Sequence, residues 1–183
     1  MREGVPPAAL ALAKMADVPT APDFAEAYDA EFEAVWLYLR RLGVPEADVE
    51  DAVHDVFVVA HRRYATYDPS RPLRPWLLGI AFRVAAQWRR QRRHEVSLAE
   101  PAIEVPDAGQ RPDDAVASEQ ARSQLHAALA QIDLHQRAVV VMHDLNGIPV
   151  PEIATSLDVP LNTIYSRLRL GRAKVAAVLR GQR

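Results

Sequence analysis

The chain has 183 residues, enough to bury a core without disulfides, and it contains no cysteine. The missing thiol excludes disulfides, thiol catalysis and cysteine-based zinc sites. A hydrophobic content of 49% argues against a disordered chain. The lack of an apolar run near ~18 residues argues against a membrane-inserted one. No signal-peptide pattern opens the sequence, so we expect a cytoplasmic protein, and the net charge of −2 argues at first against a nucleic-acid partner.

The charges, however, are segregated into four blocks of alternating sign. Residues 23–57 carry a net charge of −8 and residues 62–93 carry +8. Residues 95–119 carry −6, and residues 159–183 carry +6 without a single acid. Each block is therefore able to meet a different partner, although a charge run is also what an ordinary solvated helix face looks like.

The first elements in chain order are a tail and two helices. Residues 1–23 contain four prolines and are expected to form a loose extension. A helix is predicted over residues 24–42, ended by Gly43 and Pro45. A second helix is predicted from Glu46, with one apolar face directed to the core. That face comprises Val49, Val53, Val56, Phe57, Ala60 and Tyr64.

The second helix also carries acids on one face. Asp48, Asp51 and Asp55 lie within about 60° of one another on a helical wheel, away from most of the apolar face. Carboxylates crowded in this way repel one another by a few tenths of a kcal/mol per pair, which a basic partner surface would offset. The alternative is that they serve only solubility and the acidic start of the helix.

The segment from Tyr64 to Trp76 has three prolines in seven residues, so it is predicted to be a stiff loop. Aromatic rings and arginines flank these prolines, a combination that holds single-stranded nucleic acid by stacking and charge. The alternative is a loop that Tyr67 and Trp76 anchor in the core.

A helix over residues 76–93 follows and ends with four arginines in five residues. Arginines at a helix C-terminus suit the helix dipole, but this density favours contact with phosphates. We place the first domain at residues 24–95 and a proline-bearing acidic linker at residues 96–118.

The second domain, residues 119–183, is predicted to be helical as well. A helix over residues 118–131 is followed by one that starts after Asp133, a plausible N-cap, and stops at Gly147. A short helix with Pro151 in its first turn, a tight turn and a basic last helix complete the chain, with Asn162 or Thr163 as the cap of the last helix. Short helix, turn and basic helix is the pattern of a DNA-binding helix-turn-helix, and the alternative is an ordinary helical hairpin.

Residues 24–180 together resemble the extracytoplasmic-function group of bacterial sigma factors. Residues 48–57 (DVEDAVHDVF) look like the core-binding helix of that family, and residues 76–81 (WLLGIA) with the arginine-rich tail look like its promoter-melting segment. Residues 159–168 (VPLNTIYSRL) look like its minus-thirty-five helix-turn-helix. The order of the three motifs across one linker makes the resemblance specific.

The resemblance implies an all-α protein with two small domains that binds core RNA polymerase and both double-stranded and melted promoter DNA, without an enzymatic activity, cofactor, metal or small-molecule substrate. It also implies an anti-sigma factor that covers the same surfaces. The implied core-binding surface comprises Asp48, Asp51, His54 and Asp55. The implied minus-ten surface comprises Tyr64, Tyr67, Arg74, Trp76, Arg83, Gln87, Arg89, Arg90, Arg92 and Arg93. The implied minus-thirty-five surface comprises Asn162, Thr163, Tyr165, Ser166, Arg167, Arg169 and Arg172.

The chain departs from the family pattern at several of these positions. Arg83 stands where the family often has Asn, and Gln87 stands where it often has Asp, beside the expected minus-ten pocket. Tyr165 and Leu170 stand where basic residues are common. These departures bear on base preference at both promoter elements.

Three other functions compete with this interpretation. A sigma-mimicking module that sequesters an anti-sigma factor would not need the arginine-rich helix end or the acid-free tail. A plain helix-turn-helix regulator would leave the acidic helix and the aromatic loop unexplained. An enzyme is disfavoured because the six histidines have no ligand spacing and no glycine-rich phosphate loop is present.

Overall fold

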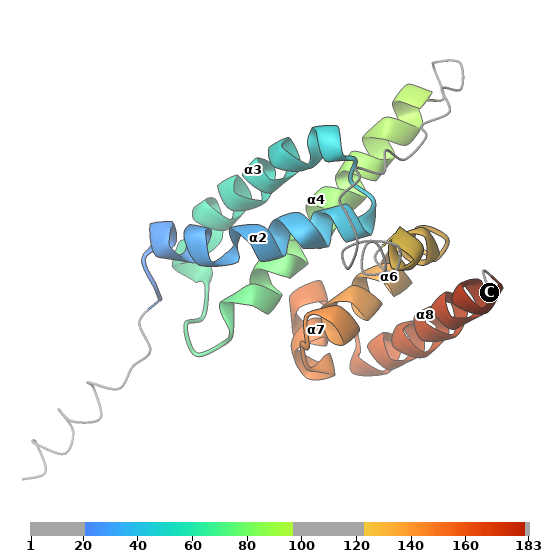
Figure 1. Ribbon diagram of the computed structural model, residues 1–183. Helices are drawn as coiled ribbons and strands as arrows, with labels where there is room; N and C mark the ends of the chain where they lie inside the picture. Colours follow the sequence, from blue (N-terminus) through green and yellow to red (C-terminus); the bar gives the residue numbers. More distant parts are fainter. Residues whose placement is uncertain (1–20, 97–122, 182–183) are drawn as a thin grey trace, which may run out of the picture.

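The computed structural model describes residues 21–96 and 123–181, and all regular elements within these ranges are helices (Figure 1). The predicted all-α fold is confirmed for this part of the chain. The predicted linker, most of the N-terminal extension and the start of the helix at 118–131 lie outside the described residues. None of the helices in the described ranges is long and apolar enough to cross a membrane.

Three helices of the first half pack against one another. They are α2 (Phe24–Leu42), α3 (Glu46–Arg63) and α4 (Leu73–Val96), with a 3₁₀ turn η1 (Tyr64–Thr66) after α3. Gly43 ends α2 with φ of 91°, a left-handed conformation that glycine adopts without strain, as predicted for this stop. The predicted apolar face of α3 enters the core, with Val49, Val53 and Val56 at 0–1% exposure.

The second half folds as a compact helical group beside α4 (Figure 1). Residues 123–130 are helical, and α6 (Leu134–Val140) runs into a wider π-helical turn η2 (Val141–Leu145). Asp133 caps α6 as predicted, because its Oδ1 accepts hydrogen bonds from the backbone N–H groups of His135 and Gln136. The short helix α7 (Val150–Leu157) and the long helix α8 (Leu161–Gly181) complete the chain.

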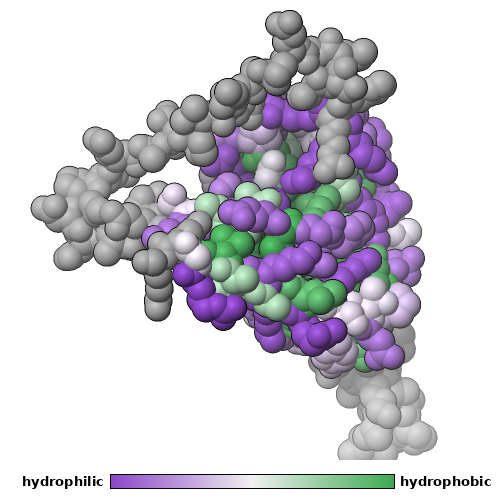
Figure 2. Space-filling view, turned by 90° about the vertical axis from the view of Figure 1, so that its right-hand side faces the viewer, coloured by the Kyte–Doolittle hydropathy of each residue, from purple (hydrophilic) through white to green (hydrophobic). Residues whose placement is uncertain are grey.

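The buried residues of both halves form one connected hydrophobic cluster. Leu39, Leu77 and Leu78 on the N-terminal side and Ile153 and Ile164 on the C-terminal side are at most 2% exposed. Each such side chain contributes roughly 1.5–3 kcal/mol by burial. On the face drawn in Figure 2, hydrophobic residues reach the surface in small areas between hydrophilic ones.

Two sequence predictions about helix starts are wrong. The loop does not extend to Trp76, because α4 already begins at Leu73, and Pro75 is accommodated in its first turn, where a missing N–H costs no helical bond. Likewise Asn162 and Thr163 do not cap the last helix. The helix begins at Leu161, and the Pro160 carbonyl accepts hydrogen bonds from the N–H groups of Thr163 (2.9 Å) and Ile164 (3.2 Å).

Candidate functional site

The acidic face of α3 is partly neutralised by α4. Asp48 Oδ2 lies 2.8 Å from Arg92 Nη2 in an ion pair, and Asp55 accepts a long hydrogen bond of 3.4 Å from Trp88 Nε1. Asp51 and His54 are exposed. Asp55 is exposed as well, so of the four predicted core-binding residues only Asp48 is partly buried.

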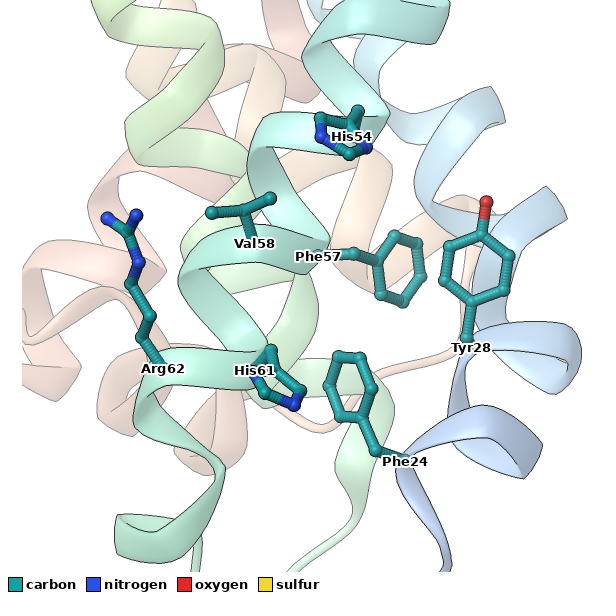
Figure 3. Close-up of a pocket in the computed structure, with 7 residues that line it drawn as sticks. All are labelled: Phe24, Tyr28, His54, Phe57, Val58, His61 and Arg62. Atoms are coloured by element: carbon teal, nitrogen blue, oxygen red, sulfur yellow. The ribbon is translucent and has the colours of Figure 1, made fainter.

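An aromatic groove lies next to His54, between α2 and α3 (Figure 3). It has a volume of about 310 Å³. Phe24 meets the ring of His61 edge to face at 4.9 Å between centroids, and Tyr28 lies 4.4 Å from Phe57. The sequence patterns did not predict this groove, because its walls come from two helices whose apolar residues are equally typical of a core.

The loop between α3 and α4 is held from within by Tyr67, which is only 9% exposed. Its hydroxyl donates to the Arg71 carbonyl, and its ring lies 5.8 Å from Tyr64, stacked, and 5.2 Å from Trp76. Burial raises the pKa of the Tyr67 hydroxyl. Tyr67 thus anchors the loop in the core, as in the alternative interpretation in which Tyr67 and Trp76 hold the loop instead of binding nucleic acid.

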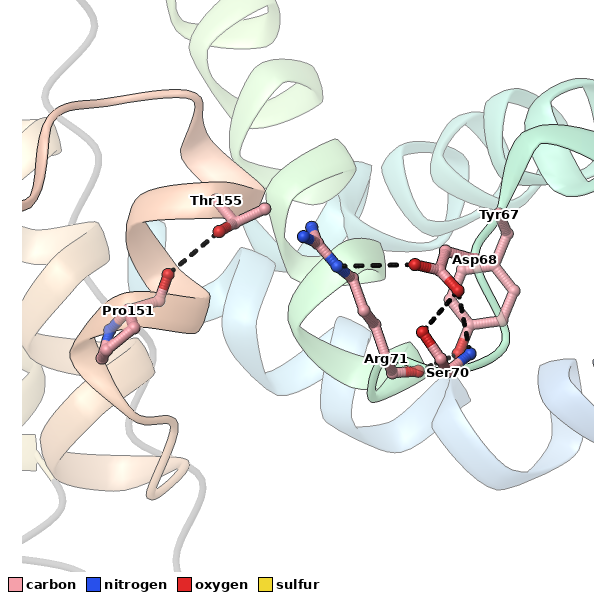
Figure 4. Close-up of polar contacts among 6 residues, drawn as sticks. All are labelled: Tyr67, Asp68, Ser70, Arg71, Pro151 and Thr155. Atoms are coloured by element: carbon pink, nitrogen blue, oxygen red, sulfur yellow. Dashed lines mark hydrogen bonds and ion pairs between the residues drawn. The ribbon is translucent and has the colours of Figure 1, made fainter. Parts of the chain in front are cut away.

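Local hydrogen bonds shape the turn that precedes α4 (Figure 4). Asp68 Oδ1 accepts from the Ser70 hydroxyl at 2.6 Å and from the Ser70 backbone N–H at 3.0 Å. These two hydrogen bonds lower the pKa of Asp68, and the nearby Arg71 acts in the same direction. At the other end of the aromatic cluster, the Tyr64 hydroxyl donates to the Pro22 carbonyl at 2.6 Å.

The arginines of α4 differ in whether their side chains are bound within the protein or exposed to a partner. Arg74 pairs with Glu31 of α2 at 2.7 Å, and Arg89 donates to the Leu42 carbonyl at 3.3 Å. Gln87 and Arg90 are exposed. Arg83 is exposed too, but its guanidinium donates to the Gly79 carbonyl at 2.8 Å and to the Ser156 carbonyl of α7 at 3.3 Å. Arg93 belongs to α4, but its side chain lies outside the described residues.

Three of these arginines border a cavity of about 640 Å³ between α4 and the second half of the chain. Arg83, Arg89 and Arg90 form one side, and residues 131–135 form the other. Such a concentration of guanidinium groups attracts anions, including nucleic-acid phosphates.

The helix-turn-helix geometry is present as predicted. Asp158 ends α7 in the left-handed region, with φ of 56°, which a short polar side chain tolerates better than most. Only two residues then separate it from α8, whose Ile164 and Leu168 are buried.

The predicted minus-thirty-five residues cluster on the first turns of α8. Asn162, Tyr165, Ser166 and Arg169 are exposed, whereas Thr163 and Arg167 are half-buried. Arg172 is exposed as well, but its guanidinium holds the Asp144 carboxylate of η2 with two hydrogen bonds at 2.9 and 3.2 Å and a third, shorter one. The hydrogen bonding with Asp144 raises the pKa of Arg172. Arg172 thus fixes α8 against η2.

Two family models match this chain, one in each half. The sigma-70 region 2 model matches residues 28–95, and the sigma-70 region 4 model matches residues 122–175. The chain is 27% identical over 142 residues to the extracytoplasmic-function RNA polymerase sigma-E factor of Escherichia coli, covering 72% of this chain and 74% of that protein. It is 32% identical over 148 residues to the RNA polymerase sigma factor CnrH of Cupriavidus metallidurans, covering 76% of this chain and 78% of CnrH. This chain belongs to the extracytoplasmic-function sigma factors.

Solved sigma-factor structures are similar in fold. The structure of CnrH in complex with the cytosolic domain of CnrY matches with a TM-score of 0.64 and 28% identity, covering 87% of this chain and 89% of CnrH. The sigma factor RpoE in complex with the anti-sigma factor NepR from Bartonella quintana matches with a TM-score of 0.73 and 19% identity, covering 89% of this chain and all of that one. The predicted family, fold class and promoter-directing function are confirmed.

Proposed function

We propose that this sigma factor binds core RNA polymerase through α3, holds the melted minus-ten strand on α4 and reads the minus-thirty-five element with α8. The single observation that carries this proposal is that one chain combines an exposed acidic helix, an arginine-bearing helix and a helix-turn-helix, in the order of sigma-70 regions 2 and 4. We propose the domain limits 24–95 and 119–183 with it.

In the core-binding surface, Asp51 and His54 are the residues that contact polymerase directly. Both are exposed on one side of α3, where a basic partner helix would offset the crowding of carboxylates. Asp48 acts mainly by joining α3 to α4 through its ion pair with Arg92. Asp55 is exposed and adds its charge to the polymerase-binding surface, while it accepts a long hydrogen bond from Trp88.

In the minus-ten surface, the exposed Arg83, Gln87 and Arg90 face the strand. The half-buried rings of Tyr64 and Trp76 provide stacking faces at the edge of the loop, and Tyr67 supports them from the core. Arg74, Arg89, Arg92 and Arg93 add positive charge along α4, which draws the phosphate backbone towards the helix.

In the minus-thirty-five surface, the first turns of α8 enter the major groove. Asn162, Tyr165 and Ser166 are exposed there, and Arg167 and Arg169 lie next to them. The N-terminal residues of a recognition helix contact base edges, while flanking basic residues contact phosphates. We therefore assign base reading to this cluster and a supporting role to Thr163 and Arg172.

An anti-sigma factor is the further partner that we propose. CnrH and RpoE were both solved as complexes, with the cytosolic domain of CnrY and with the anti-sigma factor NepR respectively. We also propose that the protein acts in the cytoplasm with RNA polymerase, and that it has no enzymatic activity of its own.

Transcription by reconstituted holoenzyme on a fragmented genomic library, with mapped start sites, tests the proposal. We expect start sites that share two upstream elements and that disappear when the sigma factor is omitted. A sigma-mimicking module would give no start sites. A plain helix-turn-helix regulator would bind DNA without supporting initiation by the core enzyme.

A further inference from the structure

The cavity between α4 and residues 131–135 carries more positive than negative charge. It has a volume of about 640 Å³, and Arg83, Arg89 and Arg90 line it. Among the described residues of its wall, Asp133 is the single acid, and its Oδ1 already accepts hydrogen bonds from two backbone N–H groups of α6. No described carboxylate forms an ion pair with any of the three arginines. The described side chains therefore leave this cationic side of the cavity without full neutralisation.

A further guanidinium adds its charge from behind the wall. Arg137 is 2% exposed, and its Nη2 donates at 3.1 Å to the carbonyl of Ile132, a residue that lines the cavity. The Nη1 atoms of Arg137 and Arg89 both donate to the Leu42 carbonyl, at 3.0 and 3.3 Å. Burial and, second, the charge of Arg89 lower the pKa of Arg137 to about 10. Like charges held this close to one another are stabilised by an anion beside them.

The opposite side of the cavity is aromatic and aliphatic. Phe82 of α4 and His135 of α6 both line it, with ring centroids 5.3 Å apart and ring planes tilted by 58°. Ala86 and Leu134 add aliphatic surface. Because His135 is exposed and Phe82 is half-buried, a flat ring in the cavity can pack against both.

The two sides together suit a ligand with phosphates at one end and an aromatic ring at the other. Guanidinium groups bind phosphate oxygens through paired, charge-assisted hydrogen bonds. Arg83 and Arg89 use only part of their N–H groups on backbone carbonyls, so donors remain for a ligand. Aromatic side chains stack on a base of any kind. An inorganic anion would use the arginines alone and leave the aromatic side uncovered.

We propose that this cavity binds a free nucleoside polyphosphate as a regulatory ligand. The phosphates lie on Arg83, Arg89 and Arg90. The base lies against the rings of Phe82 and His135. This site goes beyond the proposed function, but one consequence rests on it. Since Arg83 and Arg90 are also assigned to the melted minus-ten strand, a bound nucleotide competes with that strand.

Calorimetric titration of the full chain with ATP tests the site. Adenosine and inorganic tripolyphosphate are the comparison probes, because the first lacks the phosphates and the second lacks the base. We expect one-to-one binding of ATP that is several-fold tighter than that of tripolyphosphate and of adenosine, since phosphate contacts and stacking both add to the affinity.

Two variants remove one contact from each side of the cavity. Arg90→Ala is expected to weaken the binding of ATP and of tripolyphosphate about tenfold. His135→Ala is expected to weaken ATP binding several-fold and tripolyphosphate binding much less. Both side chains are exposed, so the fold should persist, which thermal melting followed by circular dichroism verifies. Arg63→Ala removes an exposed arginine of α3 outside the cavity and is the matched control, with parent-like ATP binding expected.

A labelled single-stranded DNA oligonucleotide distinguishes a free nucleotide from a nucleotide of the melted strand. At constant ionic strength, saturating ATP is expected to weaken binding of the oligonucleotide to the parent several-fold. Adenosine at the same concentration should leave it unchanged.

The possible outcomes separate this site from the proposed function. Absence of ATP binding, or an equal loss in Arg63→Ala and Arg90→Ala, would overturn the nucleotide site. Oligonucleotide binding that needs Arg90 and His135, without any ATP binding, would assign the cavity to the strand and also overturn it. ATP binding without competition would overturn the consequence for the strand. Failure of the parent in holoenzyme transcription, with ATP binding intact, would count against the proposed function alone.

Discussion

Arg92 of α4 and Asp48 of α3 form an ion pair of 2.8 Å that joins the proposed DNA-binding helix to the proposed polymerase-binding helix. Both side chains remain partly exposed, at 38% and 24%, so the pair itself contributes only about 0–1 kcal/mol to folding. Its importance is geometric, because it sets the position of two binding surfaces relative to each other.

The first prediction concerns the core-binding surface. The double variant Asp51→Lys with Asp55→Lys is expected to abolish binding to core polymerase, because it places two cations where a basic partner should dock. The fold should persist, since both carboxylates are exposed and Asp55 loses only a 3.4 Å hydrogen bond. Co-migration with core enzyme measures binding, and the double variant Asp29→Lys with Glu33→Lys, at two exposed positions of α2, is the charge-matched control. Parent-like affinity would exclude the assigned surface.

The second prediction concerns the minus-thirty-five surface. Arg167→Ala is expected to weaken binding to minus-thirty-five DNA by roughly 1–3 kcal/mol if Arg167 contacts a base, and by less if it meets only phosphate. Titration of a labelled duplex at several salt concentrations distinguishes these cases. Lys174→Ala, further along α8, is the control. Unchanged run-off transcription by Arg167→Ala would argue against any role for this side chain.

The third prediction concerns the contact of α6 with α8. A methyl group at Gly171 would lie 2.7 Å from Val140 Cγ2 and 3.3 Å from the Gln136 carbonyl oxygen. Gly171→Ala is therefore expected to destabilise the fold by roughly 1–3 kcal/mol through overpacking. Chemical denaturation measures the loss, and Gly181→Ala serves as the control, since a methyl group there meets nothing within 4 Å. Equal stability of the two variants would contradict the close approach.

The fourth prediction concerns the start of α6. Asp133→Ala removes the acceptor for the N–H groups of His135 and Gln136 and is expected to cost about 1 kcal/mol. Asp133→Asn should restore most of the stability, because asparagine caps helices comparably well. Denaturation midpoints of the three proteins test this order. If asparagine were no better than alanine, the loss would not come from capping.

Local patterns in the sequence predicted much of the fold. The repeat of Val49, Val53 and Val56 predicts a buried helix face because it depends only on helical geometry. Gly43 and Asp133 predict a helix stop and a helix start for the same reason. The start of α8 was placed too late because Asn162 and Thr163 are frequent cap residues, whereas both lie inside the helix, whose first hydrogen bond runs from the Ile164 N–H to the Pro160 carbonyl.

Contacts between distant residues could not be predicted in this way. Arginine is a residue type that is rarely buried, yet Arg137 is buried because Leu42, 95 residues earlier, offers a carbonyl. The same holds for Gly79 and Ser156, whose proximity follows from how two helices cross. The surfaces assigned to polymerase and DNA rest on residue type and order, and they stay predictions until they are measured.

The connected hydrophobic cluster that spans both halves has a consequence for cooperativity. A chain whose core is shared should melt in one calorimetric transition, with equal van't Hoff and calorimetric enthalpies. A variant whose halves have separated should instead show two smaller transitions, one for each half. A differential scanning trace thus reports the coupling of the halves, with no polymerase, DNA or probe present.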